Sequence, residues 1–113
     1  MTLDFTPAAL DDLRAVRAYT VERWGAAQEQ RYLDQLWRRF EDIMDDSSRF
    51  RFRHDLFPDC QIAAESRHVI LFRVRKDVLQ VVRVLHSAME FKSQLQPENL
   101  PRQKKMRRRK ESR

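Results

Sequence analysis

The sequence predicts an α+β fold, in which a small antiparallel sheet of three to four strands is packed by an N-terminal antiparallel helical hairpin. Two apolar runs rich in Val and Ile, residues 68–74 and 78–85, are separated by only three polar residues, which is typical of a β-hairpin. Before them, residues 7–45 carry apolar side chains at helical spacing on both sides of the only glycine, Gly25. The expected order is β-α-α-β-β-β, with a short helix able to follow.

The alternation of side chains in the two runs predicts which residues share a face of the sheet. Strand side chains point alternately to opposite faces, and both faces of the first run are apolar, so we expect both to be covered. By the same rule Arg67 and Arg73, an even number of residues apart, have the same strand parity. Arg83 is expected to share a face with Val81 and Leu85, each two residues away. The first run divides into Ile70, Phe72 and Val74 on one face and Val69, Leu71 and Arg73 on the other.

The N-terminal part predicts a strand followed by two helices. Residues 2–5 alternate as a short strand, and Thr6 with Pro7 fits an N-cap and a first helical position. Gly25 ends the first helix, and the second runs from about residue 26 to about residue 45, so the short connection makes an antiparallel hairpin. We expect the first helix to bury Ala9, Leu10, Leu13, Val16, Tyr19, Thr20 and Trp24, and the second Tyr32, Leu33, Leu36, Ile43 and Met44, with Trp37 and Phe40 as core anchors.

The rest of the chain predicts one domain, residues 1–95, and a basic tail. Residues 49–58 read as a basic, aromatic linker, residues 61–64 as a strand and residues 87–95 as a short helix. Residues 96–113 hold eight Lys or Arg and two Glu, which supplies the whole net charge of +6. This composition predicts disorder, and the tail suits either a solvated extension or a non-specific contact with nucleic acid.

Composition excludes several classes of protein. No run approaches the roughly 20 apolar residues of a membrane span, and the first residues lack the regions of a signal peptide. Cys60 is the only cysteine, which fits a reducing cytoplasm and a structural role for this residue. His54, His68 and His86 do not have metal-ligand spacing, and one glycine cannot form a phosphate-binding loop. We therefore expect a cytoplasmic protein without cofactor or metal.

Arginines are the remaining candidates for function. Gathered on one sheet face, they could hold an RNA phosphate while a histidine acts as general acid or base. They could equally be exposed strand positions that pair with Asp55, Asp59, Glu65 and Asp77. The candidates on or beside the predicted sheet are Arg51, Arg53, Arg67, Arg73 and Arg83, with His54, His68 and His86.

Short stretches distributed along residues 3–95 resemble the RelE/ParE superfamily of toxins from type II toxin–antitoxin systems, and specifically its ParE branch. Each stretch alone is unspecific, and their order and spacing carry the resemblance. They are residues 5–13, Tyr19, Arg23-Trp24-Gly25, Gln28 and Tyr32, the arginine-rich segment into Asp55-Leu56, residues 66–74, residues 82–86 and Met89-Glu90.

The resemblance implies one of two functions. RelE-like members are ribosome-dependent messenger-RNA endonucleases with basic residues on the strand before the hairpin, and here residues 61–64 contain none. ParE-like members share the fold, inhibit DNA gyrase and catalyse no reaction, which fits the Leu85-His86 ending with His86 as a structural residue. We therefore expect a gyrase inhibitor without catalytic residues. The alternative nuclease would use Arg51, Arg53, Arg67, Arg83 and His86.

The resemblance also implies a cognate antitoxin, a small acidic DNA-binding protein that neutralises the toxin. An open sheet edge can receive a partner strand, and an apolar helical stripe can leave a groove for a partner helix. Acidic residues of the antitoxin would complement basic residues of the toxin. The candidate partner-binding residues are Arg67, Arg73 and Arg83.

Overall fold

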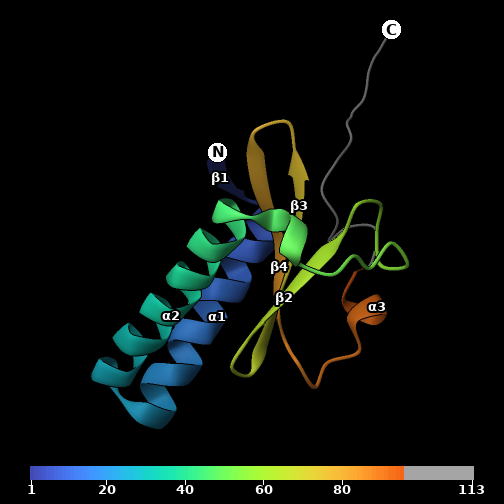
Figure 1. The fold of residues 1–113 in the computed structure, drawn as a ribbon. Coiled ribbons are helices and arrows are strands. Elements are labelled where there is room, and N and C mark those ends of the chain that lie inside the picture. The colour runs from blue at the N-terminus through green and yellow to red at the C-terminus, as the bar shows by residue number, and fades with distance from the viewer. Residues whose placement is uncertain (96–113) are drawn as a thin grey trace, which may run out of the picture.

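The computed structural model describes residues 1–95, so the basic tail predicted from Gln96 lies outside the described residues. The predicted α+β class and element order are confirmed (Figure 1). Both long helices have the expected bounds, and Thr6 caps the first by accepting a hydrogen bond from the Ala9 N–H at 3.0 Å. The elements are β1 (Thr2–Phe5), α1 (Pro7–Trp24), α2 (Ala26–Asp45), the 3₁₀-helix η1 (Ser47–Arg49), β2 (Gln61–Glu65), β3 (His68–Arg75), β4 (Val78–His86) and α3 (Phe91–Gln94).

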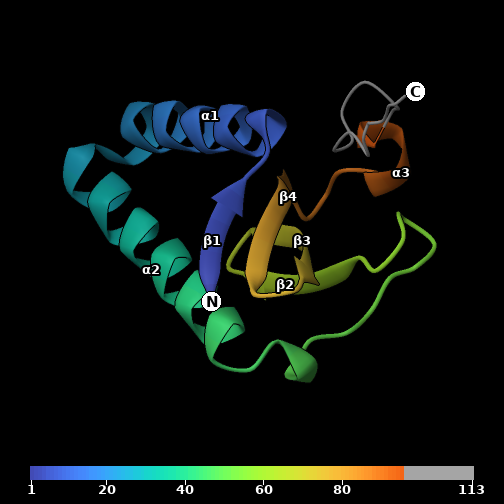
Figure 2. The ribbon, with the colours of Figure 1, turned by 90° about the horizontal axis from the view of Figure 1, so that it is seen from above.

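The four strands form one sheet in the order β1-β4-β3-β2. Strands β2, β3 and β4 are antiparallel as predicted, but β1 is parallel to β4, so the sheet is mixed. A tight turn would force β1 and β4 to pair antiparallel. The connection between them is long and includes the helical hairpin, so parallel pairing is also possible. Figure 2 shows α1 and α2 on one side of the sheet and α3 on the other.

Two apolar clusters cover the two faces of the sheet, as the alternation in β3 predicts. The helices bury Ile70 and Phe72 on one face, while the segment after η1 and α3 cover Val69 and Leu71 on the other. Phe40 is buried as expected, but Trp37 is 51% exposed and packs against Phe40 in a T-shaped arrangement, with 5.7 Å between ring centroids. The expectation that Trp37 anchors the core was therefore wrong. Leu10, Tyr19 and Trp24 of α1 are also exposed.

A bulge in β4 places Arg83 on the face of Leu85, as predicted, but not on that of Val81. Leu71 pairs with Arg83 but the next residue, Phe72, pairs with Val81, so Val82 is an extra residue in β4. The inserted residue breaks the alternation. Val81 consequently lies in the cluster under the helices and Leu85 in the opposite one.

The turn between α1 and α2 depends on the backbone of Gly25. Its φ of 89° and ψ of 169° lie in a region that only glycine adopts readily. A Cβ built there meets nothing within 4 Å, so a larger residue would suffer conformational strain without a clash. We expect Gly25→Ala to lower the free energy of unfolding by about 1–3 kcal/mol in urea denaturation, whereas Ala27→Gly, inside α2, should cost about 1 kcal/mol or less. Equal losses would contradict this role of Gly25.

Candidate functional site

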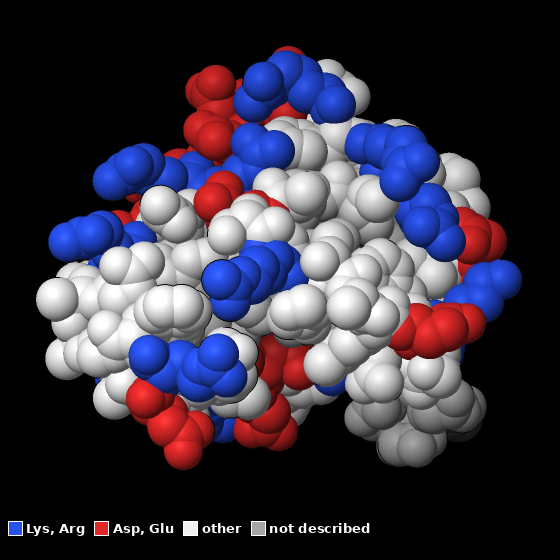
Figure 3. All heavy atoms as spheres, turned by 90° about the horizontal axis from the view of Figure 1, so that it is seen from below, with Lys and Arg blue, Asp and Glu red and all other residues white. Residues whose placement is uncertain are grey.

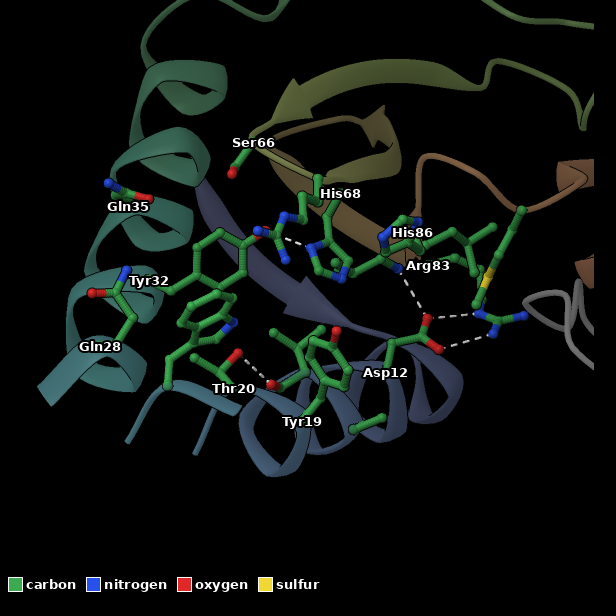
Figure 4. Close-up of a pocket in the computed structure, with 17 residues that line it drawn as sticks. Asp12, Tyr19, Thr20, Gln28, Tyr32, Gln35, Ser66, His68, Arg83 and His86 are labelled. Carbon is green, nitrogen blue, oxygen red and sulfur yellow. Dashed lines mark hydrogen bonds and ion pairs between the residues drawn. The ribbon is translucent and has the colours of Figure 1, made fainter. Parts of the chain in front are cut away.

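A cavity of about 770 Å³ opens between the helical hairpin and the adjoining ends of β3 and β4 (Figure 4). Its walls come from α1, α2, the β2–β3 turn and the segment after β4. The lining residues are Asp12, Ala15, Val16, Tyr19, Thr20, Trp24, Gln28, Tyr32, Gln35, Ser66, Arg67, His68, Arg83, Val84, Leu85, His86 and Met89.

An ion pair between α1 and β4 closes one side of the cavity. Asp12 accepts hydrogen bonds from Arg83 Nε at 2.7 Å and Nη2 at 2.8 Å, and from the backbone N–H of Val84 at 2.9 Å. The Arg83 Nη1 donates to the carbonyl of Gln94 at 2.7 Å, which ties the C-terminal segment to the same group. Both side chains are nearly buried, and the hydrogen bonds that Arg83 donates to Asp12 raise the pKa of Arg83. Arg83 is thus neutralised inside the protein.

Three rings form the polar wall of the cavity. The Tyr32 hydroxyl of α2 lies 2.5 Å from Nδ1 of His68 and 3.2 Å from the carbonyl of Glu65. His68 on β3 pairs across the sheet with His86 on β4, with 5.5 Å between ring centroids. Burial, then the neighbouring His86 and Arg67, lower the pKa of His68, and burial raises that of Tyr32 to about 12. His68 and Tyr32 are therefore neutral at physiological pH.

Exposed aromatic and basic side chains make the rim. Trp24, at the end of α1, is 53% exposed, and the guanidinium of Arg67 stacks over its indole at 5.7 Å. Arg23 lies over the same indole at 5.9 Å and over Tyr19 at 5.7 Å. Such contacts orient the guanidiniums while leaving their N–H groups available.

The structure brings together only some of the predicted site residues. Arg67, Arg83 and His86 line the cavity, whereas Arg51 and Arg53 lie on the connection after η1. Arg53 is engaged by Asp55 through two hydrogen bonds of 2.8 and 2.7 Å.

Arg73 and His54 lie apart from the cavity. Arg73 is only 7% exposed, and its Nε donates to Gln80 at 2.8 Å. His54 is exposed and stacks on Phe52. The candidate arginines therefore do not form one cluster.

Sequence reasoning missed the aromatic members of the cavity. The helical spacing predicts Tyr19, Trp24 and Tyr32 in the core, but Tyr19 and Trp24 are exposed and all three line the cavity. A usable signal was present. Ala9, Leu13, Val16 and Thr20 form one stripe at spacings of four, three and four, and Asp12, Ala15 and Tyr19 form a second stripe beside it.

On the face of the molecule seen from below, the charged side chains do not gather into a single patch (Figure 3). Figure 3 shows Lys and Arg interspersed with Asp and Glu on the face seen from below. Within residues 1–95, no cluster of side chains has the composition of a metal site, and no helix is long and apolar enough to cross a membrane. Burial raises the pKa of the Cys60 thiol to about 12, so this cysteine is not a thiolate at neutral pH.

Comparison with known proteins decides the family. A family model described as the ParE toxin of type II toxin–antitoxin system, parDE, matches residues 3–91. The chain belongs to the ParE toxin family. A curated relative, Toxin ParE of Escherichia coli, is 31% identical over 91 residues, which cover 80% of this chain and 88% of the relative.

A solved structure supports the fold of this ParE-family chain. It is described as the chromosomal ParDE TA system from P. aeruginosa, with a TM-score of 0.64 and 18% identity. The match covers 76% of this chain and 95% of the solved one. At this identity the likeness concerns the fold, and it agrees with the predicted α+β class.

Proposed function

We propose that this ParE-family toxin inhibits growth through DNA gyrase and is neutralised by a cognate antitoxin that occupies the cavity. Membership of the ParE family, by a match over residues 3–91, is the observation that carries the proposal. Action on gyrase agrees with the cytoplasmic location expected from the sequence.

The charge distribution supports gyrase inhibition over cleavage of RNA. Cleavage needs positive charge held at the scissile phosphate. Strand β2, with the sequence QIAAE, supplies no Lys or Arg, and Arg83 is already neutralised by Asp12. Arg67 is then the one arginine of the nuclease set that lines the cavity without a carboxylate partner among residues 1–95.

The sheet edge at β2 is a poor site for an added antitoxin strand, because it already has partners. The backbone N–H of Ile62 donates to the backbone carbonyl of Arg51 at 3.0 Å. The carbonyl of Cys60 accepts from the backbone N–H of Arg53 at 2.8 Å. The carbonyl of Ala64 accepts from the Arg39 side chain at 3.0 Å.

The cavity, by contrast, offers an apolar depression with exposed aromatic side chains at its rim. This is the surface that an amphipathic partner helix requires. We therefore place the antitoxin in the cavity, with its acidic residues toward Arg67.

The proposal is tested with the purified toxin in two assays run side by side. We expect it to inhibit supercoiling of relaxed plasmid by gyrase and to leave messenger RNA intact during in vitro translation. Toxin saturated with the antitoxin encoded beside it is the control, and it should leave gyrase fully active. Cleaved transcripts and arrested translation with unimpaired supercoiling would replace the gyrase proposal with the nuclease.

A further inference from the structure

We propose that the cavity is a receptor for a carboxylate with an apolar group beside it, and that Arg67 and the His68–His86 pair hold the carboxylate. The inference rests on the proposed function, since an acidic segment of the antitoxin would supply this group. It adds the chemistry of recognition, namely which protein atoms receive the carboxyl group and how its capture depends on pH.

The first receiving atom follows from the hydrogen bonds of Tyr32. Its hydroxyl lies within bonding distance of both the Glu65 carbonyl and Nδ1 of His68, but it has a single proton to donate. A carbonyl can only accept, so both contacts form when the hydroxyl donates to Glu65 and His68 Nδ1–H donates to the hydroxyl. Nε2 of His68 is then an acceptor, and it has no hydrogen-bond partner within residues 1–95.

The second receiving atom follows from the end of β4. The backbone N–H of Ala88 donates to Nδ1 of His86 at 3.1 Å, so the neutral ring carries its proton on Nε2. That N–H also has no acceptor within the described part of the chain. A carboxylate can therefore accept from the Nε2–H of His86, and it can accept from His68 once Nε2 of that ring takes up a proton.

Arg67 provides the charge. It is exposed, forms no ion pair within residues 1–95, and stacks over Trp24, which orients its guanidinium. Its backbone is fixed to the end of β4, because its carbonyl accepts the Ser87 N–H at 2.8 Å. Asp12 is the one acidic residue among those that line the cavity, and its carboxylate is already paired with Arg83. The cavity therefore has an uncompensated positive charge.

The apolar part of the cavity limits what can carry the carboxyl group. Ala15, Val16, Leu85 and Met89 lie along it. A volume of about 770 Å³ exceeds that of any one side chain, so the cavity can admit an aromatic or long aliphatic side chain and its neighbour. An occupant that combines both features, an apolar group with a carboxylate beside it, matches the wall and the rim together.

Binding of a carboxylate should also draw a proton to His68. The charged and titratable groups that face them are Asp12 from α1, Tyr32 from α2, Glu65 from β2, Arg67 from the turn and Arg83 from β4. In the empty cavity, burial, then the neighbouring His86 and Arg67, hold the pKa of His68 below its usual range. The negative charge of a bound carboxylate favours the protonated ring, so the complex holds more protons and binding strengthens as pH falls.

The test uses two small probes of equal shape, 3-phenylpropionate and its neutral amide, 3-phenylpropanamide, titrated into the full chain and followed by NMR. We expect the carboxylate to bind about tenfold more tightly than the amide, and this preference to grow from about pH 8 to about pH 6. The indole N–H of Trp24 and the rings of His68 and His86 should shift. Trp37 and His54, which do not line the cavity, are internal controls.

Two matched variants locate the effect. Arg67→Gln should remove most of the preference for the carboxylate, while Arg51→Gln, an exposed arginine outside the cavity, should leave it unchanged. The proposal is overturned if the amide binds as tightly as the carboxylate, if no saturable shift occurs, or if Trp37 and His54 shift as much as the cavity residues.

The antitoxin separates this inference from the proposed function. We expect Arg67→Gln to weaken binding of the antitoxin by about tenfold or more. Unchanged affinity would mean that the antitoxin does not use this carboxyl site, although it still neutralises the toxin. Failure of the wild-type toxin to bind the antitoxin would overturn the proposed function, and the probe titration would still decide whether the cavity binds carboxylates.

Discussion

Replacing Asp12 with alanine is expected to lower the free energy of unfolding by about 3 kcal/mol or more. The change leaves the guanidinium of Arg83 without its carboxylate in a position where the side chain is only 10% exposed. It also removes the acceptor of the Val84 N–H beside the bulge in β4. An uncompensated buried charge costs more than the pair contributes, so the loss should exceed that of an ordinary surface ion pair.

Urea denaturation of matched variants measures this effect. Asp11→Ala is the control, because Asp11 is the neighbouring residue. Its carboxylate pairs with Arg14, with 2.6 Å between Oδ1 and Nη1, and both side chains are exposed. That variant should cost about 0.5 kcal/mol or less. The double variant Asp12→Leu/Arg83→Met should be more stable than Asp12→Ala, since it leaves neither charge unpaired. Equal stabilities of the two single variants would show that the pair does not hold α1 to β4.

Local patterns were sufficient for most of the fold. The bounds of α1 follow from Thr6 and Pro7 at one end and from Gly25 at the other, all of which act within a single turn of helix. The two faces of β3 follow from alternation over residues 68–75, which only requires regular pleating. Such signals depend on neighbours in sequence, so the chain alone carries them.

The errors arise where distant segments meet. The bulge at Val82 reverses the alternation after Val81, and no residue type in β4 marks its place. The parallel pairing of β1 depends on the path of the whole helical hairpin. Trp37 has the spacing of a core residue, but Phe40 fills the position nearest the sheet and leaves the indole outside.

The composition of the candidate site was harder still to predict, because it depends on contacts between segments far apart in the sequence. The identity of Arg67 and His86 made them candidates, but their neighbours could not be inferred without the register. His68 meets His86 because β3 and β4 pair at those residues, and Tyr32 joins them from 36 residues away in sequence. The sequence alone leaves Arg83 available for a phosphate or a partner, but in the fold it is paired with Asp12, 71 residues away.

Filling the cavity from α1 should separate antitoxin binding from folding. Ala15 is exposed on α1 and lines the cavity, so Ala15→Trp places an indole where the partner segment is proposed to lie. We expect the affinity for the antitoxin to fall by at least about thirtyfold, as for loss of a central anchor. Stability should change little, because alanine and tryptophan differ by about 0.5 kcal/mol or less in helix propensity at an exposed position.

The control for this variant is Ala18→Trp. Ala18 lies on the same helix, is also exposed, and lines a separate surface depression with Arg14 and Arg17 instead of the cavity. The two variants carry the same change in propensity and in apolar surface, so a difference in antitoxin affinity, measured by calorimetry, reports the position alone. Cells that express Ala15→Trp should no longer be rescued by the antitoxin, whereas those that express Ala18→Trp should be. Equal affinity of both variants would move the antitoxin away from the cavity, because an indole at Ala15 and the partner segment cannot share that volume.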